Sequence, residues 1–397
     1  MPISHQRYRV LAAGIFSLLL CMGIARFAYT PLLPLMQQQA GLGFAEGGWL
    51  AAVNYLGYLC GALIAATVGD LVLKDRLYRL AIGLAIVTTV MMGLSDHWLV
   101  WLVSRFFAGL STAGAMLLGT GLILNWLMRH GQRPELGIHF SGIGLGIAGC
   151  AAAVGLASQW LDWREQWLAL SAIACLLAWP ALAWLPRPDG QGSASPAQLA
   201  DAPPSRRFFV LLLIAYFCCG VGYVVTATFI VAIVDALPAM QGQGSLVFLV
   251  LGLAAAPACI AWDFIARRLG EINALLLAAV LQIAGILLPL APGGLPVAMA
   301  GACLFGFTFI GLVSLVLTLA GKFYPTRPAK MMGKMTLSYG VAQMTAPAII
   351  GIWAGGRGAY DQGLLLAAGA MVLACLLLLV LRLTAVESKP RLAARTA

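Results

Sequence analysis

The sequence predicts an all-α membrane protein with twelve transmembrane helices, on three observations. Of its 397 residues, 61% are hydrophobic and only 10% are charged, whereas soluble domains carry roughly 25% charged residues. Apolar runs of about 20 residues, each long enough to cross the hydrocarbon layer as a helix, recur from end to end. These runs are continuous and do not alternate with a period of two, as barrel strands would. Lipid is therefore the expected solvent.

Each apolar run is a candidate span. In chain order the predicted spans are 9–37, 47–69, 77–94, 98–127, 136–161, 167–185, 208–237, 245–265, 273–291, 295–323, 331–354 and 363–383. The first run follows Arg7 and Arg9 and has no convincing small-residue cleavage site, so we expect it to be a retained span.

The basic residues predict the orientation of these spans. The loops on one side of the predicted membrane hold nearly all Lys and Arg, and those on the other side hold only Arg164 and Arg357. The positive-inside rule makes the basic side cytoplasmic and puts both termini there, as an even number of spans requires. We expect a multi-pass protein of the bacterial inner membrane. The formal charge of +10 then reflects topology, and nucleic acid is not an expected partner.

The nine cysteines lie in apolar runs without C-x-x-C spacing. This pattern indicates neither a disulfide framework nor a zinc site. We expect no metal and no cofactor.

The polar stretch 186–207 is rich in Pro, Ser, Ala and Gly and lies close to the chain midpoint. It predicts three parts: an N-terminal six-helix bundle (1–185), a cytoplasmic linker (186–207), and a C-terminal six-helix bundle with a short tail (208–397). A shift of 197 residues places Gly23, Gly109 and Gly114 on Gly220, Gly306 and Gly311. Such parallel repeats relate the two halves of facilitator-type transporters.

Several motifs resemble the major facilitator superfamily over essentially the whole chain. G-D-L-V-L-K-D-R-L-Y-R (69–79) resembles the family's cytoplasmic loop motif, and A-R-R-L-G (266–270) resembles its second copy. R-F-F-A-G (105–109) resembles the R-F-x-x-G motif of span 4, and D-W-R-E-Q-W (162–167) the element before span 6. The resemblance implies a monomeric secondary transporter, not an enzyme, made of two pseudo-symmetric bundles that work by alternating access.

Within the superfamily, R-F-A-Y-T-P-L-L-P-L-M (26–36) and Y-F-C-C-G-V-G-Y (216–223) resemble the bacterial YbfB/YjiJ-type group. That resemblance implies transport but names no substrate.

Two charged residues, Arg26 and Arg105, lie inside spans more than a turn from either end, whereas the acids lie in loops or within a turn of a span end. An intramembrane charge persists mainly where it faces a cavity or a partner. A bound anion gripped bidentately would supply the missing counter-ion. The alternative is that these arginines bond helix carbonyls and hold spans 1 and 4 in register.

Three polar residues are further candidates for substrate binding. Tyr223 is equivalent to Arg26 in the second half, Tyr29 lies one turn beyond Arg26, and Gln343 lies in span 11. Intramembrane tyrosines also serve as ordinary packing residues, and an intramembrane glutamine as a link between helices.

Coupling and gating have their own candidates. His139 in span 5 carries the side chain that titrates near neutral pH, although it is also interpretable as a satisfied interfacial histidine. Asp75, Arg76 and Arg79 in the loop motif, and Arg268 in its second copy, would pair across the helix ends in one conformation and part in the other.

The leading hypothesis is alternating-access transport of a small organic anion, possibly coupled to protons. One alternative is multidrug or toxic-compound efflux by a drug/proton antiporter, which is expected to need an intramembrane carboxylate that the spans lack. An alternative of another class is a membrane-embedded sensor or transferase.

Overall fold

The computed structural model describes residues 3–132, 136–188, 203–323, 328–353 and 359–385. Every secondary-structure element within these residues is helical, and none of them is a strand. This confirms the predicted all-α membrane fold. The predicted linker, 186–207, falls largely outside the described residues.

The part of the chain before the linker forms a run of helices broken by two π-helical segments. These elements are α1 (Ile3–Leu18), η1 (Leu19–Phe27), α2 (Tyr29–Gln39), α3 (Phe44–Thr67), α4 (Leu71–Leu94), α5 (Trp98–Ala113), η2 (Gly114–Gly119), α6 (Thr120–Arg129), α7 (Leu136–Ala157) and α8 (Trp163–Ala183).

The part after the linker is again helical. Its elements are α9 (Arg206–Ala236), η3 (Pro238–Met240), α10 (Gly244–Ala255), α11 (Ala258–Leu269), α12 (Glu271–Leu287), η4 (Leu288–Leu290), α13 (Gly294–Phe323), α14 (Pro328–Trp353) and α15 (Ala359–Ala385).

Ten helices in the described residues are long and apolar enough to cross a membrane, and a bent pair makes up to eleven. The pair is α10 and α11, which meet at 47° where Pro257 lacks the N–H that would continue the helix. The remaining long helix, α14, has 26 residues and carries Lys334, Ser338 and Gln343 along its length. Each of the twelve predicted spans thus falls on one continuous helical run or on this bent pair.

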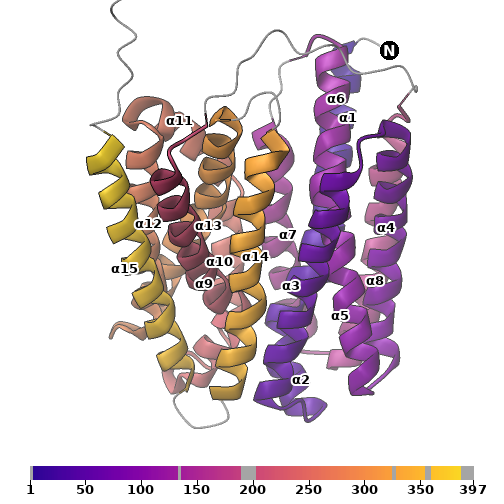
Figure 1. Cartoon of the computed structure of the whole chain (residues 1–397). Helices are drawn as coiled ribbons and strands as arrows, with labels where there is room; N and C mark the ends of the chain where they lie inside the picture. Colours follow the sequence, from indigo (N-terminus) through magenta and orange to yellow (C-terminus); the bar gives the residue numbers. More distant parts are fainter. Residues whose placement is uncertain (1–2, 133–135, 189–202, 324–327, 354–358, 386–397) are drawn as a thin grey trace, which may run out of the picture.

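Figure 1 shows the helices running roughly parallel, with α1–α8 (indigo to purple) mostly on one side and α9–α15 (dark red to yellow) on the other. We call the end where α1 begins, α8 ends and α9 begins the linker end. The opposite end, where α2 ends and α3 begins, is the far end.

The predicted start of the third span, near residue 77, was wrong, because α4 begins at Leu71. Asp70 caps this helix by accepting hydrogen bonds from the N–H groups of Val72 (3.0 Å) and Leu73 (3.4 Å). Such a cap satisfies backbone donors that the first turn leaves free. Asp75, predicted to lie in the loop before this span, therefore lies on the helix together with Arg79.

The repeat detected at an offset of 197 residues has a counterpart in packing. A Cβ added to Gly109 would lie 1.9 Å from the Asn54 carbonyl oxygen, and one added to Gly306 would lie 2.1 Å from that of Leu251. Both members of the second pair are displaced by 197 residues from the first. The close crossing of α3 and α5 in the first half thus has its equivalent in the crossing of α10 and α13 in the second half.

The two sides of the molecule meet through small residues. A Cβ on Gly144 of α7 would lie 2.2 Å from the Ala256 nitrogen, and one on Gly48 of α3 would lie 2.8 Å from the Gly351 Cα of α14. Thr30 of α2 also donates a hydrogen bond to the Ala227 carbonyl of α9 (2.9 Å). Since Gly48 and Gly351 lie at the far end, the halves are in backbone contact there.

Candidate functional site

The first span changes helix type at the position of the buried charge. In η1 the turn is wider, and the Ala28 N–H donates to the Gly23 carbonyl, five residues back (2.8 Å). Pro31 follows shortly afterwards and has no N–H to offer the Phe27 carbonyl. Such π segments are frequent at functional sites, and this one carries Arg26.

Arg26 is only 5% exposed and lies against aromatic faces. Its guanidinium carbon is 4.5 Å from the ring centroid of Tyr55 and 4.8 Å from that of Tyr58, both on α3. Buried cation–π contacts stabilise a charge by up to about 2 kcal/mol. None of the ion pairs found in the described residues includes Arg26, so its charge faces rings and not a carboxylate.

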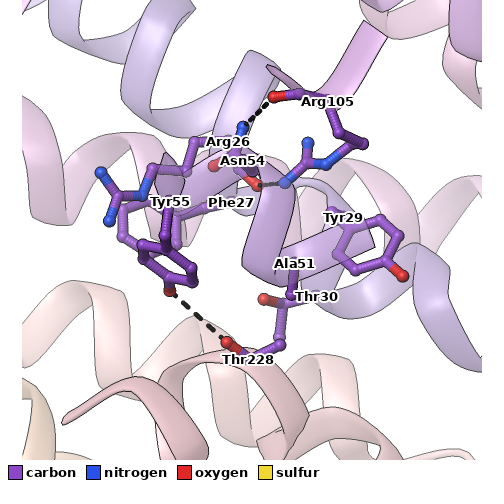
Figure 2. Close-up of a pocket in the computed structure, with 9 residues that line it drawn as sticks. All are labelled: Arg26, Phe27, Tyr29, Thr30, Ala51, Asn54, Tyr55, Arg105 and Thr228. Atoms are coloured by element: carbon purple, nitrogen blue, oxygen red, sulfur yellow. Dashed lines mark hydrogen bonds between the residues drawn. The ribbon is translucent and has the colours of Figure 1, made fainter. Parts of the chain in front are cut away.

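Arg105 of α5 is buried as well but has different partners. Its terminal nitrogens donate to the carbonyls of Ala25 (2.8 Å) and Arg26 (3.3 Å), and its guanidinium carbon lies 4.6 Å from the Tyr29 ring centroid. Arg105 thus bonds two consecutive carbonyls of the π segment. In Figure 2 the Arg105 guanidinium reaches toward the Arg26 backbone, whereas the Arg26 side chain extends away from Arg105. In this conformation Arg105 holds η1 against α5.

A small pocket lies beside both arginines and has room for about one water molecule. Since drug-sized ligands occupy pockets of about 300–1,000 Å³, the side chains that line this pocket would have to move apart to admit a substrate. Its lining residues, all drawn in Figure 2, are Arg26, Phe27, Tyr29, Thr30, Ala51, Asn54, Tyr55, Arg105 and Thr228.

The pocket spans both sides of the molecule. Thr228 belongs to α9, and its hydroxyl lies 3.4 Å from that of Tyr55. Asn54 donates its amide N–H to the Arg105 carbonyl (2.9 Å), whereas its own Oδ1 is buried without a partner in the described residues. Sequence reasoning missed these residues. The available signal was N-Y-L-G-Y (54–58), which combines an amide and two phenols within a span.

The predicted binding residues occupy different places. Tyr29 lines the pocket with its ring, but its hydroxyl donates to the Gly47 carbonyl (2.9 Å). Tyr223 of α9 lies close enough to Arg26 for an electrostatic interaction. Gln343 of α14 is buried, and its Oε1 has no partner among the described residues.

His139, the predicted coupling residue of α7, is fully buried and lies away from this pocket. Its Nε2 lies 3.0 Å from the Thr120 hydroxyl, and its Nδ1 has no partner in the described part of the chain. A Cβ on Gly14 of α1 would lie 2.3 Å from that Nδ1. The imidazole therefore fills the contact between α1, α6 and α7.

Two of the loop-motif residues, Asp75 and Arg79, link α4 to the end of α8. Asp75 pairs with Arg79 of the same helix (2.9 Å) and is 5% exposed. Arg79 also donates to the carbonyls of Leu182 (3.0 Å) and Leu185 (3.1 Å) at the end of α8. The other two predicted gating residues, Arg76 and Arg268, are exposed.

No metal-binding arrangement is present in the described residues, since no three His, Cys, Asp or Glu side chains gather there.

Comparisons with known proteins indicate the family of this chain. The family model described as "Uncharacterised MFS-type transporter YbfB" matches residues 18–379. The chain is 27% identical over 227 residues to an uncharacterized MFS-type transporter, YceJ, of Bacillus subtilis (strain 168). That alignment covers 54% of this chain and about half of the relative, 56%.

Solved structures show the same fold. A mutant form of the nucleoside transporter NupG superposes with a TM-score of 0.74 at 14% identity, covering 95% of this chain and 99% of that one. An inward-facing, unoccupied bacterial homologue of the human lysosomal transporter Spinster gives 0.65 at 16% identity, covering 96% and 98%. The predicted major facilitator fold is confirmed.

Proposed function

Because the YbfB-type family model covers most of its length, this chain belongs to that family of major facilitator transporters, and from that premise we propose that it carries a small organic anion across the membrane by alternating access. The observation that carries this proposal is Arg26, a charge buried in the pocket without an acidic partner in the described residues.

An anion would satisfy Arg26 in a way that the protein does not. The Arg26 Nε is buried and has no hydrogen-bond partner among the described residues. A carboxylate accepts two parallel N–H groups from a guanidinium and gains a charge-assisted pair in a site from which water is largely excluded. The positive potential also favours entry of an anion from water.

Arg105 supports the same site through η1 and in this proposal is a positioning residue. Its contacts to the Ala25 and Arg26 carbonyls fix the backbone that presents Arg26. A ligand held by Arg26 on one side and by Thr228 and Tyr223 of α9 on the other would link substrate occupancy to the relative position of the two halves, as transport by rocking requires.

Coupling to protons remains part of the proposal. Asp75, the buried acid at the linker end, forms an ion pair with Arg79. Asp263 is exposed and pairs with Arg267 (2.6 Å). We therefore do not expect either acid to carry the proton. We assign the proton to His139 or to the substrate itself. Asp75→Asn or Asp263→Asn is expected to leave uptake driven by a proton gradient intact, and its loss while ligand binding persists would overturn this assignment.

The multidrug alternative has less support, because a lipophilic cation would have to lie beside Arg26. A nucleoside, the substrate that the NupG name indicates, is an uncharged competitor. The likeness to NupG extends to the fold alone, so uridine serves as a comparison compound. We also propose that the protein is a monomer in the bacterial inner membrane with both termini in the cytoplasm.

The test is transport into proteoliposomes. The purified protein is challenged with jumps in the concentration of acetate, lactate, succinate, benzoate, phosphate or uridine, while uptake and transported charge are recorded. We expect at least one anion to be transported, with the signal lost in Arg26→Gln and retained in Arg164→Gln. Arg164 is the matched control, since it is half-exposed and pairs with Asp96 (3.2 Å). Transport of uridine alone, or equal anion transport by Arg26→Gln, would contradict the proposal.

A further inference from the structure

Tyr55 lies on the face of α3 that packs against α14. On one side of it along the helix, a Cβ on Gly48 would lie 2.8 Å from the Gly351 Cα. On the other side, a Cβ on Gly340 would lie 2.8 Å from the Leu59 Cδ1. Gly48, Tyr55 and Leu59 are spaced by seven and four residues, which places them on one helix face. Tyr55 therefore belongs to the surface through which the first half meets the second.

The Tyr55 side chain contacts both halves of the molecule. Its ring centroid lies 4.5 Å from the guanidinium carbon of Arg26 in η1. Its hydroxyl lies 3.4 Å from that of Thr228 on α9, the contact drawn as a dashed line in Figure 2. Only 5% of Tyr55 is exposed, so its ring shields the guanidinium from solvent. One side chain thus covers Arg26 and also connects the first half to the second.

The second tyrosine ring on Arg26, that of Tyr58, has its hydroxyl partner within the first half. Its centroid lies 4.8 Å from the guanidinium carbon, and its hydroxyl donates to the Met116 sulfur of η2 (3.6 Å). A movement of one half relative to the other leaves these two contacts intact, because Arg26, Tyr58 and Met116 move together. The contact between Tyr55 and Thr228 crosses from one half to the other and breaks in that movement. Of the two rings, Tyr55 is therefore the one whose hydroxyl contact changes when the halves part.

Tyr55 is also held less firmly than other polar side chains of the pocket. The 3.4 Å between the hydroxyls of Tyr55 and Thr228 exceeds the usual O–H···O distance of about 2.5–3.0 Å, so this contact is weak. Four other lining residues each make a hydrogen bond of 2.8 or 2.9 Å, namely Tyr29, Thr30, Asn54 and Arg105. Because the pocket has room for about one water, a side chain must move before a substrate can reach Arg26. The lowest cost falls on Tyr55.

We propose that Tyr55 is a lid on Arg26, which covers the guanidinium in this conformation and swings away from it when the site opens to a substrate. The inference rests on the proposed function and deepens it by identifying the residue that controls access to the charge. A carboxylate paired with Arg26 would replace a cation–π contact by charge-assisted hydrogen bonds, which are stronger. Substrate binding would thus favour the displaced position of Tyr55 and the loss of its contact with Thr228, which links occupancy to separation of the halves.

The test measures how fast 2,3-butanedione, a small reagent that modifies guanidinium groups, reacts with Arg26 in the purified protein. Peptide mass spectrometry follows each arginine separately. Tyr55→Leu removes the lid and should accelerate the modification of Arg26 at least about fivefold, as expected from the loss of a desolvated cation–π contact. Half-exposed Arg164 is the internal reference and should react at an unchanged rate. At least one anion of the proteoliposome assay should slow the modification of Arg26 in the Tyr55→Leu protein.

Two milder variants keep an aromatic ring on Arg26. Tyr55→Phe and Thr228→Val each remove the contact between the two hydroxyls and should each accelerate the reaction of Arg26 about twofold. The double variant should react no faster than either single one, because the same contact is lost in all three. These variants also carry the test if Tyr55→Leu does not fold. Tyr216→Leu is the matched control, since it removes another buried phenol, one that stacks on Tyr339, and it should leave the rate at Arg26 unchanged.

The outcomes distinguish the lid from the proposed function. The lid inference is wrong if Arg26 reacts equally fast in the wild type and in folded Tyr55→Leu protein, or if Tyr216→Leu accelerates the reaction as much. Unchanged rates in both Tyr55→Phe and Thr228→Val would also overturn it. In each of these cases anion transport still stands if uptake depends on Arg26. If Tyr55→Leu exposes Arg26 but acetate, lactate, succinate, benzoate and phosphate all leave its modification unslowed, the lid stands and the anion proposal fails.

Discussion

Gly48 and Gly351 hold the backbones of α3 and α14 together at the far end, so Gly48→Ala should drive these helices apart. The added Cβ would lie 2.5 Å from the Pro347 carbonyl oxygen and 2.8 Å from the Gly351 Cα. Backbone atoms cannot yield as a flexible side chain does. Overpacking of this kind typically costs about 1–3 kcal/mol, which would shift a two-state equilibrium roughly 5- to 150-fold toward the conformation that separates the halves there.

Double electron–electron resonance measures this shift. Spin labels at Gln38 on α2 and Gln362 on α15, both exposed at the far end, report the distance between the two halves. Gly48→Ala should add a population at longer distance. Gly83→Ala is the matched control, because a Cβ there meets nothing within 4 Å. Identical distance distributions for wild type, Gly48→Ala and Gly83→Ala would refute the reasoning.

Two further predictions concern the linker end and the topology. Arg79→Ala leaves buried Asp75 unpaired and should lower the free energy of unfolding by about 2 kcal/mol, less than the 3–5 kcal/mol of a fully buried pair because Arg79 is 22% exposed. Thermal unfolding in detergent measures this loss of stability. Arg76→Ala is the control and should have no effect. Equal melting temperatures of the two variants would contradict the prediction. Cysteine introduced at Gln241 in the far-end loop should react with an impermeant maleimide added outside intact cells, whereas cysteine at Pro203 should not, and the reverse pattern would invert the topology.

The fold followed from the sequence because its signals are local. A run of apolar residues predicts a span without knowledge of its neighbours, and the glycines at an offset of 197 residues mark helix crossings that both halves share. The start of α4 was misplaced because the charged segment around Asp75 looks like a loop. The charges of Asp75 and Arg79 are instead accommodated by pairing and by the carbonyls at the end of α8, contacts that depend on tertiary packing.

The site was predictable only in part. Arg26 and Arg105 stood out because intramembrane charges are rare, but the sequence does not reveal the π segment whose carbonyls Arg105 bonds, and these bonds determine the role of Arg105. The hydroxyl of Tyr29 was expected to face the cavity and instead bonds the Gly47 carbonyl, because α2 packs on the start of α3. The aromatic pair that encloses Arg26 was missed, since tyrosines within an apolar span do not reveal the face on which they lie.

The central claim is that Arg26 holds the charge of the substrate, and the affinity of a transported anion for Arg26 variants tests it most directly. Titration calorimetry with the anion identified in proteoliposomes should show a loss of at least about 30-fold in Arg26→Gln, as expected when a buried charge loses its partner. Arg26→Lys should also bind substantially more weakly, because it keeps the charge but loses the planar fork. Unchanged affinity in a folded Arg26→Gln protein would contradict the claim and place the anion elsewhere.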